Sequence, residues 1–136
     1  MNDTSRRIVV VDDDPSVRRG LERLLKSAGY QVETQASARE FLGSGDYDRA
    51  SCLVLDVRMP GQSGLELQTV LEEAGYHIPV IFITGHGDIP MAVRAIKAGA
   101  VDFLTKPFDD QTFLDAVSQA IAKDRRPRRA DTLSSE

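Results

Sequence analysis

The chain alternates between short apolar runs and longer segments in which apolar residues recur every three or four positions. The short runs predict strands that are buried on both faces of a parallel sheet, and the longer segments predict amphipathic helices. The expected strands cover residues 8–11, 31–35, 52–55, 80–83 and 101–104. An expected helix follows each strand, bounded by capping and breaking residues, at 14–29, 37–45, 63–75, 89–99 and 109–122. Five such pairs predict an α/β fold with right-handed crossovers and helices on both faces of one doubly wound sheet.

Local signals set the helix boundaries and the faces that we expect to be buried. Asp14 before Pro15 is an expected N-cap with proline at the first helical position, and Ser37 with Glu40 fits a capping box. Apolar spacing then predicts which residues of the longer helices face inward. These are Val17, Leu21, Leu24, Leu25 and Ala28; Leu67, Val70, Leu71 and Ala74; Ile89, Val93 and Ile96; and Phe113, Val117, Ala120 and Ile121.

Four of the expected strands end in polar side chains that suit one chemistry. Asp12 and Asp13 follow the first strand, Asp56 follows the third, Thr84 the fourth and Lys106 the fifth. Each residue alone has a simpler explanation as a helix cap, a strand former or a surface charge. In an open parallel sheet, however, ligands bind outside the carboxyl ends of the strands, so we expect these side chains to meet at one edge.

Three carboxylates at one edge require neutralisation. Two like charges 4 Å apart cost about 4 kcal/mol at an effective dielectric constant of 20. A set of hard oxygen ligands without histidine or cysteine favours Mg²⁺ over zinc. Asp56 could then act as a nucleophile toward phosphorus, while Lys106 spreads the charge of the phosphoryl group and the Thr84 hydroxyl donates to its oxygens.

Composition and charge narrow the class of protein. Cys52 is the only cysteine, and no run approaches the roughly 18 apolar residues of a membrane span or has the form of a signal peptide, so we expect a cytoplasmic protein. Residues 1–122 carry 12 basic and 18 acidic groups, a net charge of −6, whereas 123–136 carries +2. An acidic globule does not itself predict nucleic-acid binding. We expect a folded domain over 1–122 and a basic, polar linker over 123–136.

The motifs together resemble the receiver domain of two-component response regulators, in particular the FixJ type. The resemblance rests on the Asp12-Asp13 pair, Asp56 within LDVRMPG, Thr84 within FITGHGD, and Lys106-Pro107 within DFLTKPF. It extends from about residue 7 to 123. It implies a flavodoxin-like sheet with the strand order 2-1-3-4-5 and phosphorylation of Asp56 by a sensor histidine kinase.

The resemblance also implies a role for each residue of the motifs. Asp13 and Asp56 would bind Mg²⁺ through their carboxylates, Asp12 mostly through water, and Arg58 through its backbone carbonyl. The residues implied to contact the phosphoryl group or to respond to it are Thr84, Lys106 and, as the aromatic switch, Phe103. The Lys106–Pro107 peptide bond would be cis, which would keep Lys106 aimed into the site. His86, beside Thr84, is open as a modulator of phosphoryl lifetime or a solvated loop residue.

The resemblance further implies a phosphorylation-dependent homodimer and an output domain. In FixJ-type relatives the helix at 90–98 and the fifth strand form the dimer face, on which Met91, Ala92, Ala95 and Lys97 are candidates here. The unphosphorylated form would be mainly monomeric. Contact with DNA would be made only by a missing C-terminal helix-turn-helix domain, and no contact with a membrane is expected.

Two other interpretations remain open from the sequence. A phosphohydrolase of the haloacid dehalogenase type would use Asp12 as nucleophile and Asp14 as acid and base. In that interpretation Thr84, Lys106 and the Asp109-Asp110 pair would also belong to the active site. The chain lacks the cap insertion of such enzymes, however, and this interpretation leaves Asp56 unexplained. A receiver fold that serves only as an interaction module would have lost an acid or the lysine, and this chain keeps all of them.

Overall fold

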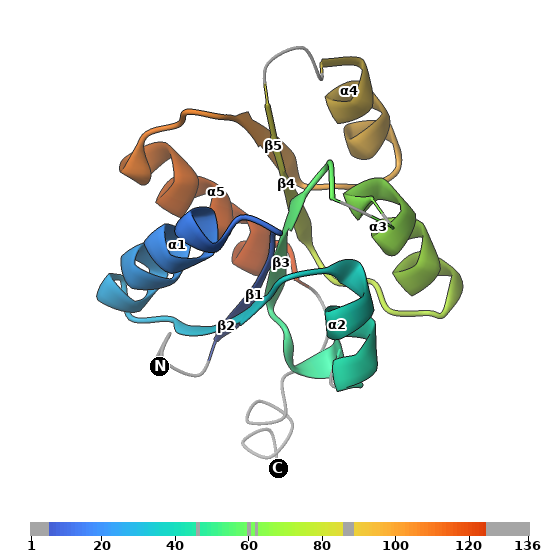
Figure 1. Cartoon of the computed structure of the whole chain (residues 1–136), viewed down its shortest axis with the longest axis horizontal. Helices are drawn as coiled ribbons and strands as arrows, with labels where there is room; N and C mark the ends of the chain where they lie inside the picture. Colours follow the sequence, from blue (N-terminus) through green and yellow to red (C-terminus); the bar gives the residue numbers. More distant parts are fainter. Residues whose placement is uncertain (1–5, 46, 60, 62, 86–88, 125–136) are drawn as a thin grey trace.

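A computed structural model of the chain describes residues 6–45, 47–59, 61, 63–85 and 89–124 (Figure 1). The strands are β1 (Arg7–Val11), β2 (Gln31–Gln35), β3 (Cys52–Asp56), β4 (Val80–Thr84) and β5 (Asp102–Thr105). The α-helices are α1 (Pro15–Ser27), α2 (Ala38–Ser44), α3 (Gly64–Glu73), α4 (Ile89–Lys97) and α5 (Asp110–Ala122). All ten predicted elements are present, with β5 one residue later than expected, and a short 3₁₀-helix, η2 (Tyr47–Arg49), was not predicted. None of the described helices is both long and apolar enough to cross a membrane.

The strands form one parallel sheet in the order β2-β1-β3-β4-β5, which confirms the predicted doubly wound topology. Helices α1 and α5 cover one face of the sheet, and α2, α3 and α4 cover the other (Figure 1). The registers align Val11 with both Gln35 of β2 and Leu55 of β3. The ends of the central strands therefore lie level with one another, and the residues that follow them emerge at one edge of the sheet.

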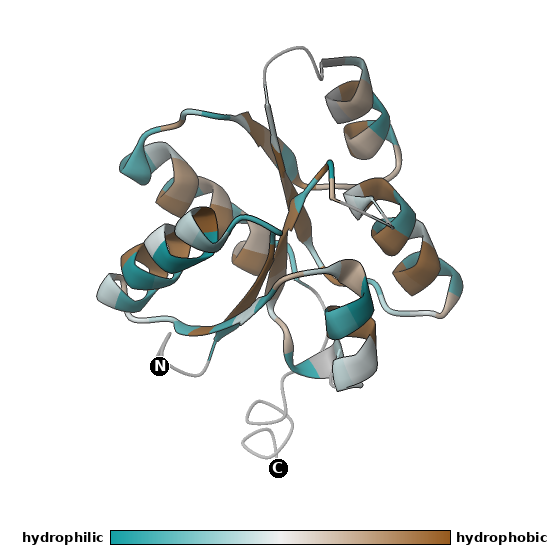
Figure 2. Cartoon of the chain, in the orientation of Figure 1, coloured by the Kyte–Doolittle hydropathy of each residue, from teal (hydrophilic) through white to brown (hydrophobic). Residues whose placement is uncertain are grey.

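Alternate residues of the strands enter two separate hydrophobic clusters, one on each face of the sheet. In Figure 2 the strands form a largely apolar layer between helices that carry both hydrophilic and hydrophobic residues. All residues of β3 and β4 are buried. The cluster under α1 and α5 includes Ile8, Val10, Val54, Ile83, Leu25 and Phe113, and the cluster under α2, α3 and α4 includes Val9, Val11, Leu55, Phe82, Phe41 and Leu67. The strands that carry the site are thus supported from both sides.

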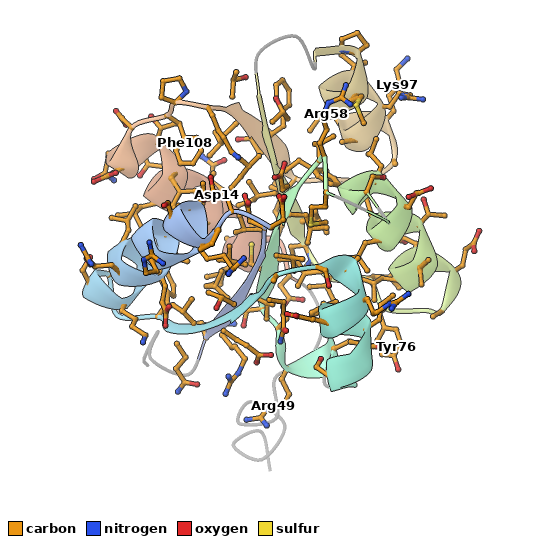
Figure 3. The ribbon with its side chains drawn as sticks, in the orientation of Figure 1. Asp14, Arg49, Arg58, Tyr76, Lys97 and Phe108 are labelled. Carbon is orange, nitrogen blue, oxygen red and sulfur yellow. The ribbon has the colours of Figure 1, made fainter. Side chains whose placement is uncertain are left out.

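The predicted capping residues occupy the starts of α1 and α2. Asp14 lies at the start of α1 (Figure 3), and its carboxylate accepts a hydrogen bond from the Ser16 backbone N–H at 2.8 Å. Ser37 accepts from the Glu40 N–H at 3.1 Å. The Glu40 carboxylate accepts from the N–H of Ala36 rather than of Ser37, so the expected capping box is only half formed. These side chains satisfy N–H groups that have no partner within the helix.

The buried face of α3 differs from the prediction. Val70 is 38% exposed and Ala74 is exposed, whereas Gln68 is only 3% exposed. The expected stripe followed apolar character, but the face that meets the sheet runs through Gly64, Leu67, Gln68 and Leu71 and includes a polar residue. In α1, Ala28 is exposed because it is the C-cap. The other inward-facing residues expected in α1, α3 and α5 are buried or half-buried: Val17, Leu21, Leu24, Leu25, Leu67, Leu71, Phe113, Val117, Ala120 and Ile121.

The phase of α4 was also predicted wrongly. Val93 and Ile96, expected to face inward, are 45% and 39% exposed, while Ala95 is fully buried and Met91 packs against the core. The spacing gives this helix a distinct apolar side, but that side is not the one most deeply buried against the sheet. The small side chain of Ala95 faces the sheet, and the larger Val93 and Ile96 face outward. The side chain of Ile89 lies outside the described residues.

This phase changes the expected dimer face. Ala95 is excluded from it by burial, and Met91 is only partly accessible. Lys97 remains exposed, and Val93 and Ile96 join it on the outer side of α4. The side chain of Ala92 and the whole of residue 86 lie outside the described residues.

Replacing Gln68 by leucine should raise the free energy of unfolding by about 1 kcal/mol. The Gln68 side-chain oxygen is buried and has no hydrogen-bond partner among the described residues. An unpaired buried acceptor loses its hydration without compensation, and leucine has similar volume without that penalty. Chemical denaturation of both proteins measures the difference. Exposed Gln111→Leu is the control, and a lower stability of Gln68→Leu than of wild type would contradict the prediction.

Candidate functional site

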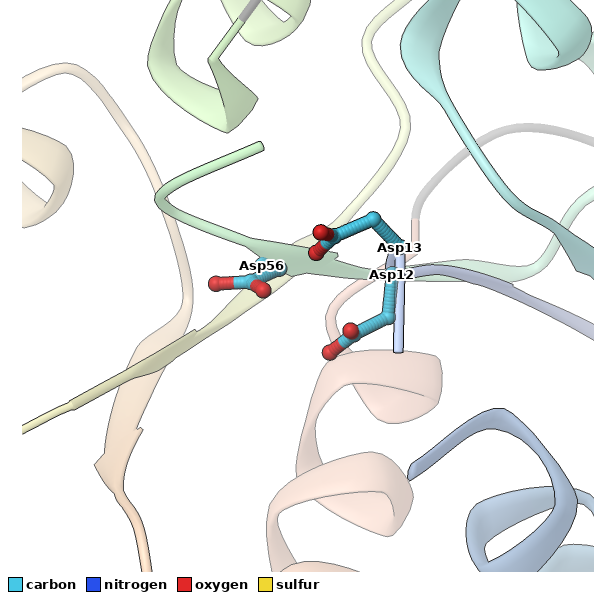
Figure 4. A group of neighbouring side chains, drawn as sticks. All are labelled: Asp12, Asp13 and Asp56. Atoms are coloured by element: carbon cyan, nitrogen blue, oxygen red, sulfur yellow. The ribbon is translucent and has the colours of Figure 1, made fainter. Parts of the chain in front are cut away.

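Side chains from three strand ends meet at the carboxyl edge of the sheet. Asp12 and Asp13 follow β1, and Asp56 is the last residue of β3. One carboxylate oxygen of each residue lies within 4.8 Å of those of the other two. Figure 4 shows the three carboxylates grouped around one small space. The sequence prediction that acids from the first and third strands lie together is therefore met by the geometry.

Lys106 completes this cluster from the end of β5. Its Nζ lies 3.6 Å from Asp12 Oδ2 and 3.8 Å from Asp56 Oδ2. Asp12 is fully buried and Asp56 is 8% exposed, so both ion pairs are shielded from solvent on the carboxylate side. Pairs of this kind offset part of the cost of burying the charges. One cation nevertheless faces three acids.

The pKa values of two of these carboxyl groups, Asp12 and Asp56, are raised. Burial is the main reason that the pKa of Asp56 rises from 3.8 to about 6, and repulsion from Asp12 adds to it. Lys106 and the Arg58 backbone N–H, 3.1 Å from Asp56 Oδ1, act in the opposite direction. Burial also raises the pKa of Asp12, against the N–H of Asp14, which donates to Asp12 Oδ1 at 2.9 Å. The site therefore favours either a proton or an additional cation.

The backbone around Lys106 ties β5 to β4. The Lys106 N–H donates to the Thr84 carbonyl at 2.8 Å. The Lys106–Pro107 peptide bond is cis, as the resemblance implied. Lys106 is half-buried, with its ammonium toward the acids. Its position depends on both strands rather than on one flexible loop.

Thr84 and Phe103 occupy the face of the sheet covered by α2, α3 and α4. Thr84 is fully buried, and its hydroxyl donates to the neighbouring Gly85 carbonyl at 3.1 Å. It follows Phe82 by two residues, so it points to the same face as that core residue. Phe103 is half-buried against the same cluster and aligns with Phe82 across the β4–β5 pair. The structure thus places Thr84 and Phe103 in neighbouring strands on one face.

The β3–α3 loop begins directly after Asp56 and contacts its carboxylate. Arg58 lies beside α4 (Figure 3), and its backbone N–H holds the Asp56 carboxylate. The following helix begins with a complete capping box: Ser63 Oγ accepts from the Glu66 N–H at 3.2 Å, and the Glu66 carboxylate accepts from the Ser63 N–H at 2.8 Å. Residues 60 and 62 of this loop lie outside the described residues. The loop is anchored at both ends.

The donor set fits a divalent cation of the Mg²⁺ type. The three clustered side chains offer only carboxylate oxygens, which are the ligands that Mg²⁺ prefers. Asp12 Oδ2 is buried and makes no hydrogen bond within the described part of the chain.

The sequence analysis overlooked Arg18 at this site, whose guanidinium donates to the Asp12 carbonyl at 2.7 Å. Its position on the second turn of the helix after the acid pair was the available signal.

Residues 8–118 match the family described as the response regulator receiver domain. The chain belongs to this family. It is 58% identical over 127 residues to nodulation protein W of Bradyrhizobium diazoefficiens, a match that covers 93% of this chain and 56% of that protein. It is 51% identical over 121 residues to the response regulator protein TodT of Pseudomonas putida, covering 89% of this chain and 53% of TodT.

The FixJ-type resemblance is confirmed by sequence and by structure. The chain is 45% identical over 117 residues to the transcriptional regulatory protein FixJ of Rhizobium meliloti, covering 86% of this chain and 57% of FixJ. The solved structure of FixJ-N matches with a TM-score of 0.80 at 42% identity, over 87% of this chain and 94% of that one. The response regulator StyR matches with a TM-score of 0.85 at 50% identity, over 96% and 66%. This receiver chain spans little more than half the length of the curated relatives named here.

Proposed function

We propose that the chain accepts a phosphoryl group on Asp56 from a phosphohistidine of a sensor kinase, in a Mg²⁺-dependent reaction. The observation that carries the proposal is the meeting of Asp56 with two further acids and Lys106, which come from three strand ends. Membership of the receiver family supports the same chemistry. The protein is then a signalling component that catalyses only its own phosphorylation and dephosphorylation.

In the proposed reaction a carboxylate oxygen of Asp56 attacks phosphorus. The new O–P bond forms as the N–P bond of the phosphohistidine breaks, and the bonding electron pair leaves with the imidazole nitrogen. The Lys106 ammonium, now 3.8 Å from Asp56, would pair with an oxygen of the transferred group. The buried Thr84 hydroxyl would exchange its bond to Gly85 for one to the phosphoryl group.

Asp13 and Asp56 would hold the metal ion through their carboxylates. Asp12 would act mostly through water, and Arg58 would contribute its backbone carbonyl. When bound, Mg²⁺ supplies positive charge that offsets the developing negative charge of the phosphoryl oxygens. Without the ion, burial and then repulsion from Asp12 keep the pKa of Asp56 raised, although Lys106 pairs with it.

Phosphorylation would alter the surface through the ends of β4 and β5. The phosphoryl group adds about two negative charges and new acceptors, which would draw the Thr84 hydroxyl toward the site. Phe103 lies on the same sheet face as Thr84 and is half-buried, and it would turn inward as Thr84 moves toward the phosphoryl group. The outer side of α4, with Val93, Ile96 and Lys97, would then form a homodimer together with β5.

The remaining parts of the proposal concern the whole protein. The relatives include transcriptional regulatory proteins, and the chain spans little more than half of their length. We infer that residues 1–122 form the receiver domain and that 123–136 lead to a C-terminal output domain that contacts DNA. Residues 125–136 lie outside the described residues. A cytoplasmic location and the absence of membrane contact are part of the same proposal.

Asp56→Asn should abolish phosphorylation by acetyl phosphate and Mg²⁺, because the amide is no nucleophile toward phosphorus. Wild type should incorporate phosphate and shift from monomer to dimer in light scattering, and the variant should do neither. Asp13→Asn should be labelled more slowly at limiting Mg²⁺, whereas exposed Asp110→Asn should behave like wild type.

Mapping the modified residue by trapping and mass spectrometry separates the candidate functions. Phosphate on Asp56 supports the receiver mechanism, and phosphate on Asp12 would instead support the hydrolase. Labelling of Asp56→Asn at an unrelated residue would refute the assignment. A wild-type protein that neither binds Mg²⁺ nor responds to beryllofluoride would indicate an interaction module without phosphorylation.

A further inference from the structure

The corner between β1 and α1 is held by hydrogen bonds on both sides of Asp12. The Asp12 N–H donates to the Gln35 carbonyl of β2 at 3.1 Å. The Asp12 carbonyl accepts from Arg18 Nη1 of α1 at 2.7 Å, and the Asp12 carboxylate accepts from the Asp14 N–H. Both main-chain groups of Asp12 are therefore fixed, one by the sheet and the other by a half-buried arginine.

Asp13, in contrast, has an exposed side chain that makes no hydrogen bond within the described part of the chain. Its carboxylate nevertheless belongs to the cluster with Asp12 and Asp56. The carbonyl of Asp12 and the N–H of Asp13 belong to one planar peptide unit. Holding that carbonyl therefore also fixes the plane of the peptide unit and the position of the Asp13 Cα, from which the Asp13 side chain leaves the backbone.

We propose that Arg18 is a positioning residue of the metal site, whose bond to the Asp12 carbonyl aims the Asp13 carboxylate at the divalent cation. The inference rests on the proposed Mg²⁺ site. Groups that orient metal ligands contribute substantially to affinity, and their removal typically weakens metal binding about 10- to 100-fold. Arg18 would act without touching the cation itself.

The sign of the effect distinguishes positioning from simple electrostatics. Arg18 carries a positive charge near a cation site, so loss of that charge alone would tighten Mg²⁺ binding. Loss of positioning would weaken it. Arg19 is the matched control, because it is a neighbouring, exposed arginine of the same helix with no hydrogen bond or ion pair within the described residues.

Isothermal titration with Mg²⁺ at constant ionic strength tests the proposal on the full chain. Arg18→Met removes the hydrogen-bond donor, and Arg18→Gln keeps an amide donor on a side chain too short to reach the Asp12 carbonyl. Each substitution should weaken Mg²⁺ binding about tenfold. Arg18→Lys keeps a charged donor and should bind Mg²⁺ with an affinity between those of Arg18→Met and wild type. Arg19→Met should bind as wild type or slightly more tightly. Thermal unfolding checks that each variant is folded. If only one of Arg18→Met and Arg18→Gln folds, the Mg²⁺ affinity of that variant is compared with that of wild type.

A kinetic measurement adds a readout that lost stability would not reproduce. The Mg²⁺ concentration for half-maximal labelling by acetyl phosphate should rise about tenfold in Arg18→Met, while the rate at saturating Mg²⁺ stays within about twofold of wild type. Unchanged or tighter binding in both Arg18 variants would overturn the inference, as would an equal loss in Arg19→Met. Failure of the wild type itself to bind Mg²⁺ would instead refute the proposed metal site.

Discussion

Replacing Gly64 by alanine should lower the free energy of unfolding by about 2–3 kcal/mol, the usual cost of forcing extra atoms into a packed site. A Cβ on Gly64 would collide with the backbone carbonyl oxygen of Asp56 and would lie 2.9 Å from the Phe82 ring. The ring can shift, but the carbonyl belongs to the last residue of a fully buried strand. The Gly64 N–H also donates to the Val57 carbonyl at 3.1 Å, which keeps the start of α3 against that strand. Denaturant unfolding followed by circular dichroism measures the loss.

Gly20→Ala is the matched control for this substitution. Gly20 is an exposed residue in the interior of α1, and a Cβ there would meet no atom within 4 Å. Alanine should therefore stabilise the protein by about 0.5–1 kcal/mol, because it reduces the backbone entropy lost on folding. If Gly64→Ala lowers the free energy of unfolding and Gly20→Ala raises it, the close approach of the Asp56 carbonyl to Gly64, rather than the loss of a glycine, decides the effect. An unfolding midpoint of Gly64→Ala equal to that of wild type would contradict the steric argument.

The fold was predictable because the strands are buried on both faces. A strand such as Cys52–Asp56 must then be a continuous apolar run, and the glycines and caps around it mark where helices begin and end. Helix faces were less predictable, since the most apolar side of α4 is not its most buried side and α3 buries Gln68. Burial in those helices depends on which side chains fit between helix and sheet. Sequence spacing alone does not contain that information.

The clustering of the acids with Lys106 was predictable for a different reason. Parallel strands deliver their carboxyl ends to one edge, so a polar residue after each strand has a known destination. Gly64 and Arg18 escaped the sequence analysis because each acts on a backbone carbonyl, of Asp56 and Asp12 respectively. Every residue has a backbone carbonyl, so a contact with one does not depend on the residue type that carries it. It becomes visible only when distances between main-chain atoms are known.

The burial of Asp56 beside other acids should make the metal-free protein less stable as the pH rises through the pKa of Asp56. Burial, followed by repulsion from Asp12, raises that pKa to about 6, above the ordinary value of 3.8 that it regains on unfolding. Between these values the folded protein holds a proton that the unfolded chain releases. The stabilisation from this group is therefore complete below about pH 4 and is lost by about pH 7, with a total near 3 kcal/mol at 1.36 kcal/mol per pKa unit.

Asp56→Asn should remove this penalty, because the amide is neutral at every pH. Without Mg²⁺ at pH 7.5 the variant should be more stable than wild type by about 3 kcal/mol, which corresponds to an unfolding midpoint higher by roughly 10 °C. At pH 4 the two proteins should unfold at nearly the same temperature. Differential scanning calorimetry at both pH values measures the two differences. Other carboxyl groups titrate in both proteins, so the comparison isolates Asp56.

Magnesium should reverse the order of stability. A cation that binds only the folded state stabilises it by RT ln(1 + [L]/Kd), so saturating Mg²⁺ should raise the wild-type midpoint at pH 7.5 far more than that of Asp56→Asn. Exposed Asp110→Asn removes the same charge away from the acidic cluster and should not reproduce the gain. A variant no more stable than wild type without Mg²⁺, or equally stabilised at pH 4 and pH 7.5, would show that repulsion among Asp12, Asp13 and Asp56 is not stored in the fold. The buried negative charge that weakens the metal-free protein, through desolvation first and repulsion second, is also the charge that a bound divalent cation offsets.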